Sequence, residues 1–176
     1  ALTPYALSYK ELPLQDRDVA KAKELLKQAG YASGASIKIR TITGNALHRD
    51  SAQFIAANLR EVGIDVQIEA VDSGVWINDW IAGTTPPVMN GWGGFTDPDL
   101  AFFRHFHSRP DGMDFRRWKN KEADKLLEQG RTTLDPAKRK PIYDQVQRLI
   151  AQEAISIPLY APQLIYVTSA KVKNFR

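Results

Sequence analysis

The stretch from residue 97 to residue 114 holds the side chains of this sequence that are best suited to metal or acid–base chemistry. His105 and His107 form an H-x-H pair, and Asp111 and Asp114 follow closely. Three or four such ligands could hold a metal ion if the chain folded them inward. Residues i and i+2 point to different sides of a helix, however, and the H-E-x-x-H spacing of zinc proteases is absent. The pattern therefore favours a structural or surface role for both histidines.

A second pair of acids flanks Pro98. Asp97 and Asp99 could divide acid and base roles if their surroundings pushed their pKa values apart. An Asp before a Pro is also a common helix start, where the carboxylate caps a backbone N–H and meets the positive helix end. We therefore predict that Asp97 caps a helix. The alternative function is an α/β enzyme, a hydrolase or a metal-dependent enzyme, that uses His105, His107, Asp97 and Asp99.

Trp92 stands among three glycines in the run GWGG at positions 91–94. This run lacks the third glycine of G-x-G-x-x-G and the Gly-Lys-Ser/Thr ending of a P-loop, so a nucleotide site is not expected. Small residues around a large flat side chain instead leave a recess that a ligand or another domain can approach. Phe95, Trp76 and Trp80 are further aromatics near predicted loops, although the last two, four residues apart, also fit a core stripe.

Several other chemistries have no motif in this chain. It has no cysteine, which excludes disulfides, thiolate catalysis and cysteine-based metal sites, and it has no G-x-S-x-G elbow. The net charge is only +4, and the basic residues between 116 and 140 alternate with acids, so a solvated surface is favoured over a nucleic-acid partner. No cofactor is expected. His48, in a polar stretch, is interpreted as a cap or a solvated residue.

Two successive helix–turn–strand units begin the predicted fold. The first is a helix from about residue 16 to Gly30 and a strand over 37–42, and the helix carries an apolar stripe of Val19, Ala22, Leu25, Leu26 and Ala29. The second is a helix over about 47–62 and a strand over 64–70, with Phe54, Ile55, Leu59 and Val62 on one side of the helix. Such long connections allow helical crossovers, so we predict parallel neighbouring strands in an α/β sheet.

Helices dominate the rest of the chain. We predict a short helix over 75–81, a helix capped by Asp97, one capped by Asn120 and a long one that starts at Asp135. The Asp97 helix has an apolar side made of Leu100, Phe102, Phe103 and Phe106. Strands are predicted over residues 88–92, 155–160 and 164–169.

Length and composition fit a single domain. The chain has 176 residues with 43% hydrophobic and 25% charged residues, which excludes disorder, collagen and coiled coil as its main class. Residues 1–15 form an irregular strap, and no apolar run approaches the roughly 20 residues that cross a bilayer. The opening ALTPYALSYKELPLQ lacks the order of a signal peptide.

Four stretches, taken in order, resemble a known family. They are DVAKAKELLKQAGY, FIAANLREVGIDVQIEAVD, VMNGWGGFTDPDLAFF and the stretch from NKEADKLLEQGRTTLDPAKRK to ISIPLY. Together they resemble the C-terminal part of the extracytoplasmic solute-binding proteins of family 5, the oligopeptide-, dipeptide- and nickel-type receptors of ABC importers. The resemblance runs from about residue 16 to residue 175 and rests on the combination of motifs rather than on any one of them.

The resemblance implies an α/β fold like a lobe of the type II periplasmic binding proteins, with a mixed, mainly parallel sheet flanked by helices. Residues 1–176 would form a single C-terminal lobe of a two-lobed protein. A signal sequence would then lie far upstream, before the other lobe. The final KVKNFR would stop short of the usual end of such proteins.

The resemblance also implies a solute site. In peptide-binding members, aromatics at the positions of Trp76 and Trp92 line the cleft, and an Asp three residues after the second one pairs with the peptide amino group. Here that position is Phe95, or Gly94 if the one-residue shortening before Asp97-Pro98 is placed earlier in the alignment. Some members carry a basic residue three positions before this Trp, and the residue here is Met89. These departures favour a less charged solute, such as a sugar, an opine-like or a modified compound, stacked on Trp92 and Phe95. Asp97 could serve as a substitute anchor. The candidate ligand-binding residues are Trp76, Met89, Trp92, Gly93, Gly94, Phe95 and Asp97.

The function implied is binding without chemistry. Contacts made only in the closed state would shift an open–closed equilibrium, and a permease would read the closed form. The expected partners are a small-molecule or peptide solute, the ABC permease and the missing N-terminal lobe of the same chain. The expected location is the periplasm or another extracytoplasmic compartment.

Overall fold

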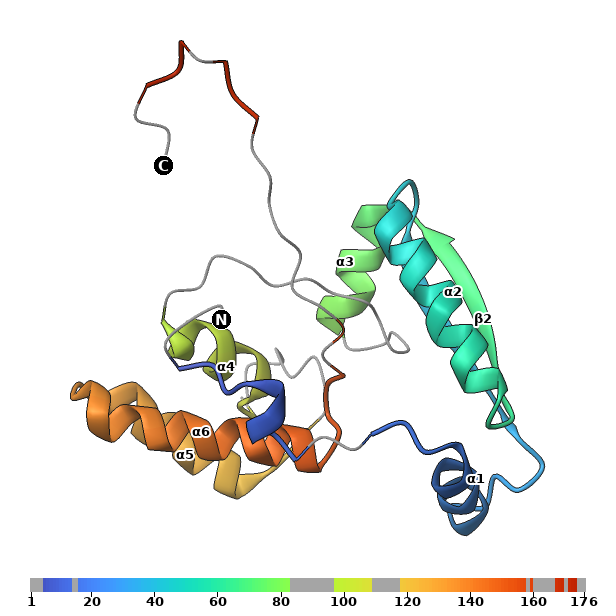
Figure 1. Cartoon of the computed structure of the whole chain (residues 1–176), viewed down its shortest axis with the longest axis horizontal. Coiled ribbons are helices and arrows are strands. Elements are labelled where there is room, and N and C mark those ends of the chain that lie inside the picture. The colour runs from blue at the N-terminus through green and yellow to red at the C-terminus, as the bar shows by residue number, and fades with distance from the viewer. Residues whose placement is uncertain are drawn as a thin grey trace.

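The structure is a computed structural model of the chain, and it describes residues 5–13, 16–82, 97–108, 118–157, 159, 167–169 and 171–173. The elements are η1 (Tyr9–Glu11), α1 (Val19–Gln28), β1 (Ala35–Ile42), α2 (Ala46–Arg60), β2 (Ile64–Val71), α3 (Ser73–Ala82), α4 (Pro98–Phe106), α5 (Lys121–Thr132) and α6 (Pro136–Gln152). Figure 1 shows them in two groups, an α/β unit that contains β1, β2 and α1 to α3, and a helical unit of α4 to α6.

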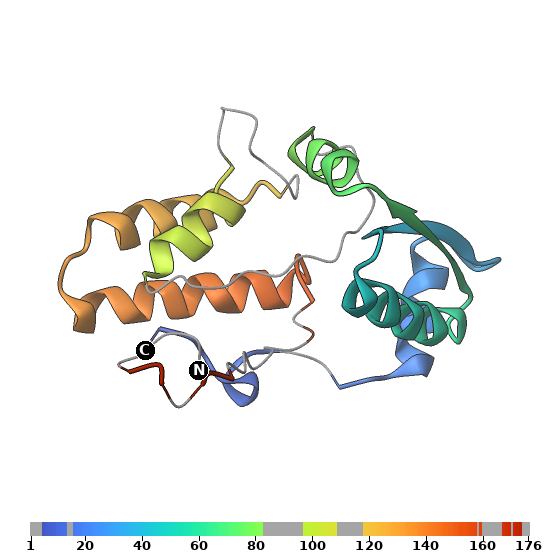
Figure 2. The ribbon, with the colours of Figure 1, turned by 90° about the horizontal axis from the view of Figure 1, so that it is seen from above.

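The helical unit is built around α6. Figure 2 shows α6 between the α4–α5 pair on one side and the N-terminal strap with η1 on the other. Its core consists of Trp118, Ala123, Leu127, Tyr143, Val146 and Ile150. Gln147 ties the strap to this core, because its side-chain amide donates to the Tyr5 carbonyl at 2.9 Å and its Oε1 accepts from the Leu7 N–H at 3.0 Å.

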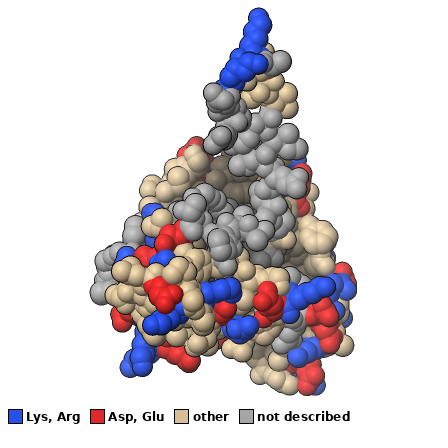
Figure 3. Space-filling view, turned by 60° about the vertical axis from the view of Figure 1, so that its left-hand side comes forward, with Lys and Arg blue, Asp and Glu red and all other residues tan. Residues whose placement is uncertain are grey.

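Charges of both signs are interspersed over the outer surface of the molecule on the face that Figure 3 shows. Ion pairs within and between helices account for part of this pattern, for example Lys140 with Asp144 at 2.8 Å, one turn apart on α6. This mixture agrees with the alternation of acids and bases in the sequence.

The α/β unit contains the predicted pair of parallel strands. β1 and β2 pair along their whole length, from Ala35 opposite Ile64 to Ile42 opposite Val71. Helix α2 covers one face and forms a core of Ile39, Ala52, Ala56 and Val66. The prediction of neighbouring parallel strands with a helical crossover is therefore confirmed.

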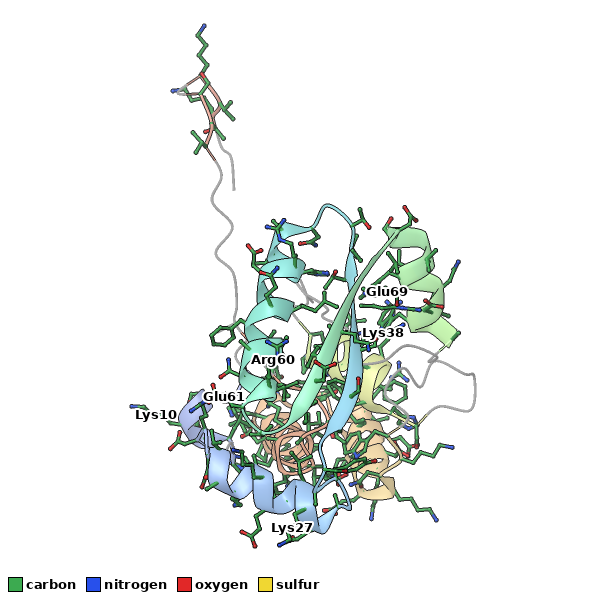
Figure 4. The ribbon with its side chains drawn as sticks, turned by 90° about the vertical axis from the view of Figure 1, so that its right-hand side faces the viewer. Lys10, Lys27, Lys38, Arg60, Glu61 and Glu69 are labelled. Carbon is green, nitrogen blue, oxygen red and sulfur yellow. The ribbon has the colours of Figure 1, made fainter. Side chains whose placement is uncertain are left out.

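The other face of this sheet is charged. Lys38 and Glu69 lie side by side on the two strands in Figure 4, with Lys38 Nζ 3.4 Å from Glu69 Oε2. Arg40 donates to the same carboxylate at 2.9 Å and also pairs with Asp79 of α3. The hydrogen bond from Arg40 lowers the pKa of Glu69. The Arg40–Asp79 pair links α3 to the sheet, whereas α2 packs on it through apolar residues.

The predicted helix ends are confirmed where they depend on local chemistry. Asp97, Asn120 and Asp135 each accept a hydrogen bond from a backbone N–H in the first turn of the helix that follows. Gly30 has a φ of 87°, and the N–H groups of Gly30 and Tyr31 donate to Lys27 and Leu26. This is the Schellman arrangement that a Gly–apolar pair predicts.

Some residues assigned to the buried side of a helix are exposed. Phe54 was expected to face the core, but its exposed fraction is 71%, because Ala52, Ile55 and Ala56 form the stripe of α2 that meets the sheet. Leu25, Ala29 and Leu100 are exposed as well, and no residue of α1 is fully buried. These helices use a narrower apolar face than their sequences suggest.

The two predicted C-terminal strands are not found in the part of the chain that is described. Residues 155–157, 159 and 167–169 carry no strand, and β1 and β2 form the sole sheet of the described residues. Ile157 and Val167 are largely exposed. A run of β-branched residues becomes a strand only when a neighbouring strand satisfies its backbone, and no such neighbour is described here.

Gly130 of α5 lies against the ring of Tyr143, and a Cβ added to it would come within 2.9 Å of two ring carbons. Gly→Ala in a helix interior normally stabilises by about 0.5–1 kcal/mol. Here we expect Gly130→Ala to lower the free energy of unfolding by about 1–3 kcal/mol, because the fully buried ring cannot move away. Urea unfolding measures the change.

The matched control is the double variant Gly130→Ala/Tyr143→Leu, in which the shorter side chain leaves room for the new methyl group. The two substitutions should be strongly non-additive in a double-mutant cycle. Additive effects, or stabilisation by Gly130→Ala alone, contradict the close approach.

Candidate functional site

Two aromatic residues meet at the carboxyl end of the parallel strands. α2 and α3 begin just after β1 and β2 end, so their first turns share that edge of the sheet. His48 lies in the first turn of α2 and Trp76 in the first turn of α3, with ring centroids 6.4 Å apart and an angle of 45°. Open α/β sheets place ligands at the carboxyl ends of their strands. Trp76 is therefore located where a ligand is expected.

Both rings of this pair carry a buried polar atom without a hydrogen bond. His48 Nδ1 and Trp76 Nε1 have no partner among the described residues. Trp76 is only 5% exposed and stacks on Trp80 with centroids 5.9 Å apart. Buried polar groups in native proteins are nearly always paired, so unsatisfied ones often mark a site that binds something else. The pair thus holds two unsatisfied nitrogen atoms, the indole N–H donor of Trp76 and the imidazole Nδ1 of His48.

His48 was not among the predicted site residues. The interpretation as a solvated residue is wrong, because the side chain is partly buried, and the capping group is Asn45, which accepts from the His48 N–H at 3.0 Å. Burial lowers the pKa of the imidazole, which favours its neutral form at pH 7. The sequence gives no local signal for this contact, since His48 and Trp76 belong to different helices.

Most of the other predicted site residues lie outside the described residues. These are Met89, Trp92, Gly93, Gly94 and Phe95, together with the strand predicted over 88–92. The described chain ends before them with Ala82 of α3 and resumes at Asp97. Trp76 and Asp97 therefore belong to the two elements between which this segment runs.

Asp97 is held by an arginine from the far end of the sequence. Arg139 Nη1 and Nη2 donate to its two carboxylate oxygens at 2.8 and 2.9 Å, and Oδ1 also accepts from the Asp99 N–H at 2.8 Å. The hydrogen bond from Arg139 is the main cause that lowers the pKa of Asp97. Both oxygens are thus engaged within the chain.

The acids around Pro98 are not arranged for acid–base catalysis. Asp99 Oδ2 lies 3.3 Å from Arg131 Nε, so each acid of the pair has its own arginine. A general acid at neutral pH needs a raised pKa, and that of Asp97 is lowered. The capping role predicted for Asp97 is confirmed.

The histidine pair has structural contacts. His105 is buried, with Nδ1 2.7 Å from the Ala101 carbonyl oxygen, whereas His107 stacks on Phe103 and approaches Glu128 at 3.3 Å. Within the described ranges, no group of three or more His, Cys, Asp or Glu residues could hold a metal ion. Asp111 and Asp114 lie outside those ranges. None of the described helices has the length and apolar character to cross a membrane.

Comparison with known proteins identifies the family. The family model for bacterial extracellular solute-binding proteins, family 5 (middle region), matches residues 1–114, which include Trp76, the segment 83–96 and Asp97. The chain belongs to this family. The resemblance inferred from the sequence motifs is confirmed, and with it the α/β lobe of the type II periplasmic binding proteins.

Relatives of known structure or name support this assignment. The glutathione-binding protein GsiB of Escherichia coli (strain K12) is 32% identical over 181 residues, which cover 97% of this chain and 35% of GsiB. The binding protein DppA of Helicobacter pylori in complex with the peptide STSA is 30% identical with a TM-score of 0.72, over 78% of this chain and 28% of DppA. The binding protein MoaA of A. tumefaciens R10 in complex with mannopinic acid is 26% identical with a TM-score of 0.70, over 78% of this chain and 29% of MoaA.

The chain spans about a third of the length of the curated relatives it matches. The family and these relatives are named for solute binding, and none of them supports the alternative of an α/β enzyme that uses His105, His107, Asp97 and Asp99.

Proposed function

We propose that this chain is the C-terminal lobe of a receptor that captures a small solute and delivers it to an ABC permease. The observation that carries the proposal is the family match over residues 1–114, which contains the predicted site. The N-terminal lobe of the same receptor would supply the other wall of the cleft. The working location is the periplasm or another extracytoplasmic compartment, where the receptor meets the permease at the membrane.

The proposed site has an aromatic floor. Trp76 and Trp92 line it, Phe95 adds a stacking surface, and Gly93 and Gly94 let the solute approach the backbone. Met89 completes the set carried over from the family. To these we add His48, because its ring lies with its centroid 6.4 Å from that of Trp76 at the carboxyl edge of the sheet, and each ring carries a buried polar atom without a hydrogen bond.

The chemistry of this site favours a solute with uncharged hydrogen-bonding groups. The position at which peptide-binding members place an amino-anchoring Asp is Phe95 or Gly94 here, and the oxygens of Asp97 already bind Arg139. A neutral imidazole and an indole N–H on neighbouring rings suit a solute with groups that both accept and donate, such as an amide or a hydroxyl. Modified peptides, sugars and opine-like compounds all carry such groups.

Transport follows from a shift in population. The closed form binds a solute that contacts both lobes more tightly than the open form does. The solute therefore increases the fraction of receptor molecules that are closed. The permease would recognise the closed form and take up the solute without any covalent step. This cycle requires binding energy and no catalyst.

The function is tested by calorimetry on the full-length receptor with glutathione, the peptide STSA and mannopinic acid, each titrated alone. We expect at least one to bind with a micromolar or lower Kd and to be recovered chemically unchanged. Trp76→Phe, which keeps an aromatic ring but replaces the larger indole and removes its N–H donor, should raise that Kd about tenfold. Leu134→Ala, at an almost fully exposed position between α5 and α6, should leave it unchanged.

One result would contradict this function, and another would contradict the site. Conversion of a probe to a product would indicate an enzyme. Equal Kd values for the wild-type receptor, Trp76→Phe and Leu134→Ala would show that the indole N–H of Trp76 does not meet the solute.

A further inference from the structure

All three guanidinium nitrogen atoms of Arg139 donate hydrogen bonds within the chain. Its side chain, 14% exposed, donates to Asp97 through both Nη atoms and to the Gly130 carbonyl through Nε at 2.8 Å. A guanidinium matches a carboxylate in this two-bond geometry and fixes its orientation, which a lysine cannot do.

Four segments of the chain converge on this one side chain. Arg139 belongs to the first turns of α6, Asp97 caps α4 and Gly130 lies near the end of α5. The guanidinium carbon also lies 5.7 Å from the ring centre of Tyr5 in the strap and 5.3 Å from that of Tyr143. Arg139 therefore fixes where α4 begins relative to the whole helical unit.

Asp97 follows directly after the segment that carries the predicted solute-binding aromatics. Trp92 precedes it by five residues in the sequence. Even a fully extended chain of that length spans no more than about 18 Å, so the position of Asp97 restricts the space that Trp92 can reach. The same segment, residues 83–96, begins directly after α3, the helix that carries Trp76.

We propose that Arg139 is a positioning residue for solute binding, which acts through Asp97 on the segment that carries Trp92. This inference rests on the proposed function, in which Trp92 contacts the solute. Arg139 itself does not touch the solute. Its pair with Asp97 stays charged at neutral pH, because the hydrogen bonds between them lower the pKa of Asp97 and raise that of Arg139. The contact is therefore a fixed anchor.

Arg131 provides a matched control within the same helices. It approaches the neighbouring acid Asp99 with one nitrogen at 3.3 Å, is 52% exposed and lies over the Phe103 ring at 3.9 Å. It thus joins α5 to α4, as Arg139 joins α6 to α4, but it does not contact the residue that follows the segment. Removing either arginine deletes one positive charge and one arginine–carboxylate pair.

The test compares Arg139→Met and Arg131→Met in the full-length receptor, at a temperature at which both variants are fully folded. Calorimetry with glutathione, STSA and mannopinic acid gives the Kd. The indole ¹H–¹⁵N resonance of Trp92, assigned with Trp92→Phe, reports the surroundings of that side chain. We expect Arg139→Met to raise the Kd at least tenfold and to shift the Trp92 resonance, and Arg131→Met to change neither.

An unchanged Kd in Arg139→Met, or an equal loss in both variants, overturns the proposal while leaving the receptor function intact. If Arg139→Met does not fold, Arg139→Lys replaces it, and a Kd and Trp92 resonance like those of the wild type in that variant overturn the proposal. If the wild-type receptor binds none of the three probes, the proposed function itself fails, and this inference fails with it.

Discussion

Replacing Trp92 by alanine in the full-length receptor is expected to raise the Kd for its solute by about a hundredfold, because a buried Trp at the centre of a binding site contributes about 2–4 kcal/mol. The melting temperature should fall by less than about 4 °C, since the residue is proposed to line the cleft rather than the core. Calorimetry and thermal unfolding of the same preparation measure both quantities.

Leu134→Ala is the control for this variant, because it also shortens an apolar side chain but lies at an exposed turn. A Trp92→Ala receptor that keeps its affinity and loses several degrees of stability would show that Trp92 is a core residue. The aromatic residues of the proposed site would then be Trp76, Phe95 and His48, without Trp92.

Tyr143→Ala is expected to have the largest effect on stability, a loss of about 3–5 kcal/mol in the free energy of unfolding. Tyr143 is fully buried in the core of the helical unit. Its ring lies 6.0 Å from that of Tyr5 and 5.8 Å from that of Phe102, so it joins the strap and α4 to α6. Alanine leaves a cavity at the point where these segments meet. Urea unfolding measures the resulting loss in the free energy of unfolding.

Tyr143→Phe removes the hydroxyl and keeps the ring, so it measures the contribution of the hydroxyl alone. The hydroxyl is buried without a hydrogen bond to the described residues, and burial raises its pKa although the nearby Arg139 acts in the opposite direction. Removing an unsatisfied polar atom should therefore change the free energy of unfolding by less than about 1 kcal/mol, or increase it. A loss of more than 2 kcal/mol in Tyr143→Phe would contradict this packing, since it would mean that the hydroxyl is satisfied.

The sequence was sufficient for features that depend on neighbouring residues. Asp97, Asn120 and Asp135 cap the helices that follow them, and the spacing of the first two helix–strand units predicted parallel strands correctly. Capping is decided within one turn, and alternation along a strand within a few residues. The family resemblance was likewise visible in the order of short motifs.

Features that depend on distant contacts were missed. Arg139 binds Asp97 across 42 residues, and nothing near either residue indicates the pairing. His48 meets Trp76 only because two helices start at the same sheet edge. Phe54 was assigned to the wrong side of α2 because small Ala residues, not the largest apolar one, face the sheet. The described residues of the predicted C-terminal strands carry no strand, because strand propensity cannot supply a pairing partner, and residues 158, 160 and 164–166 lie outside the described part of the chain.

Native mass spectrometry of the full-length receptor, purified without denaturation from cells that express it, tests the central claim most directly. We predict a complex with one small solute in the wild-type protein, and its absence from Trp92→Ala prepared in the same way. The same bound mass in both proteins, or release of a chemically converted product, would contradict a receptor that captures its solute at Trp92.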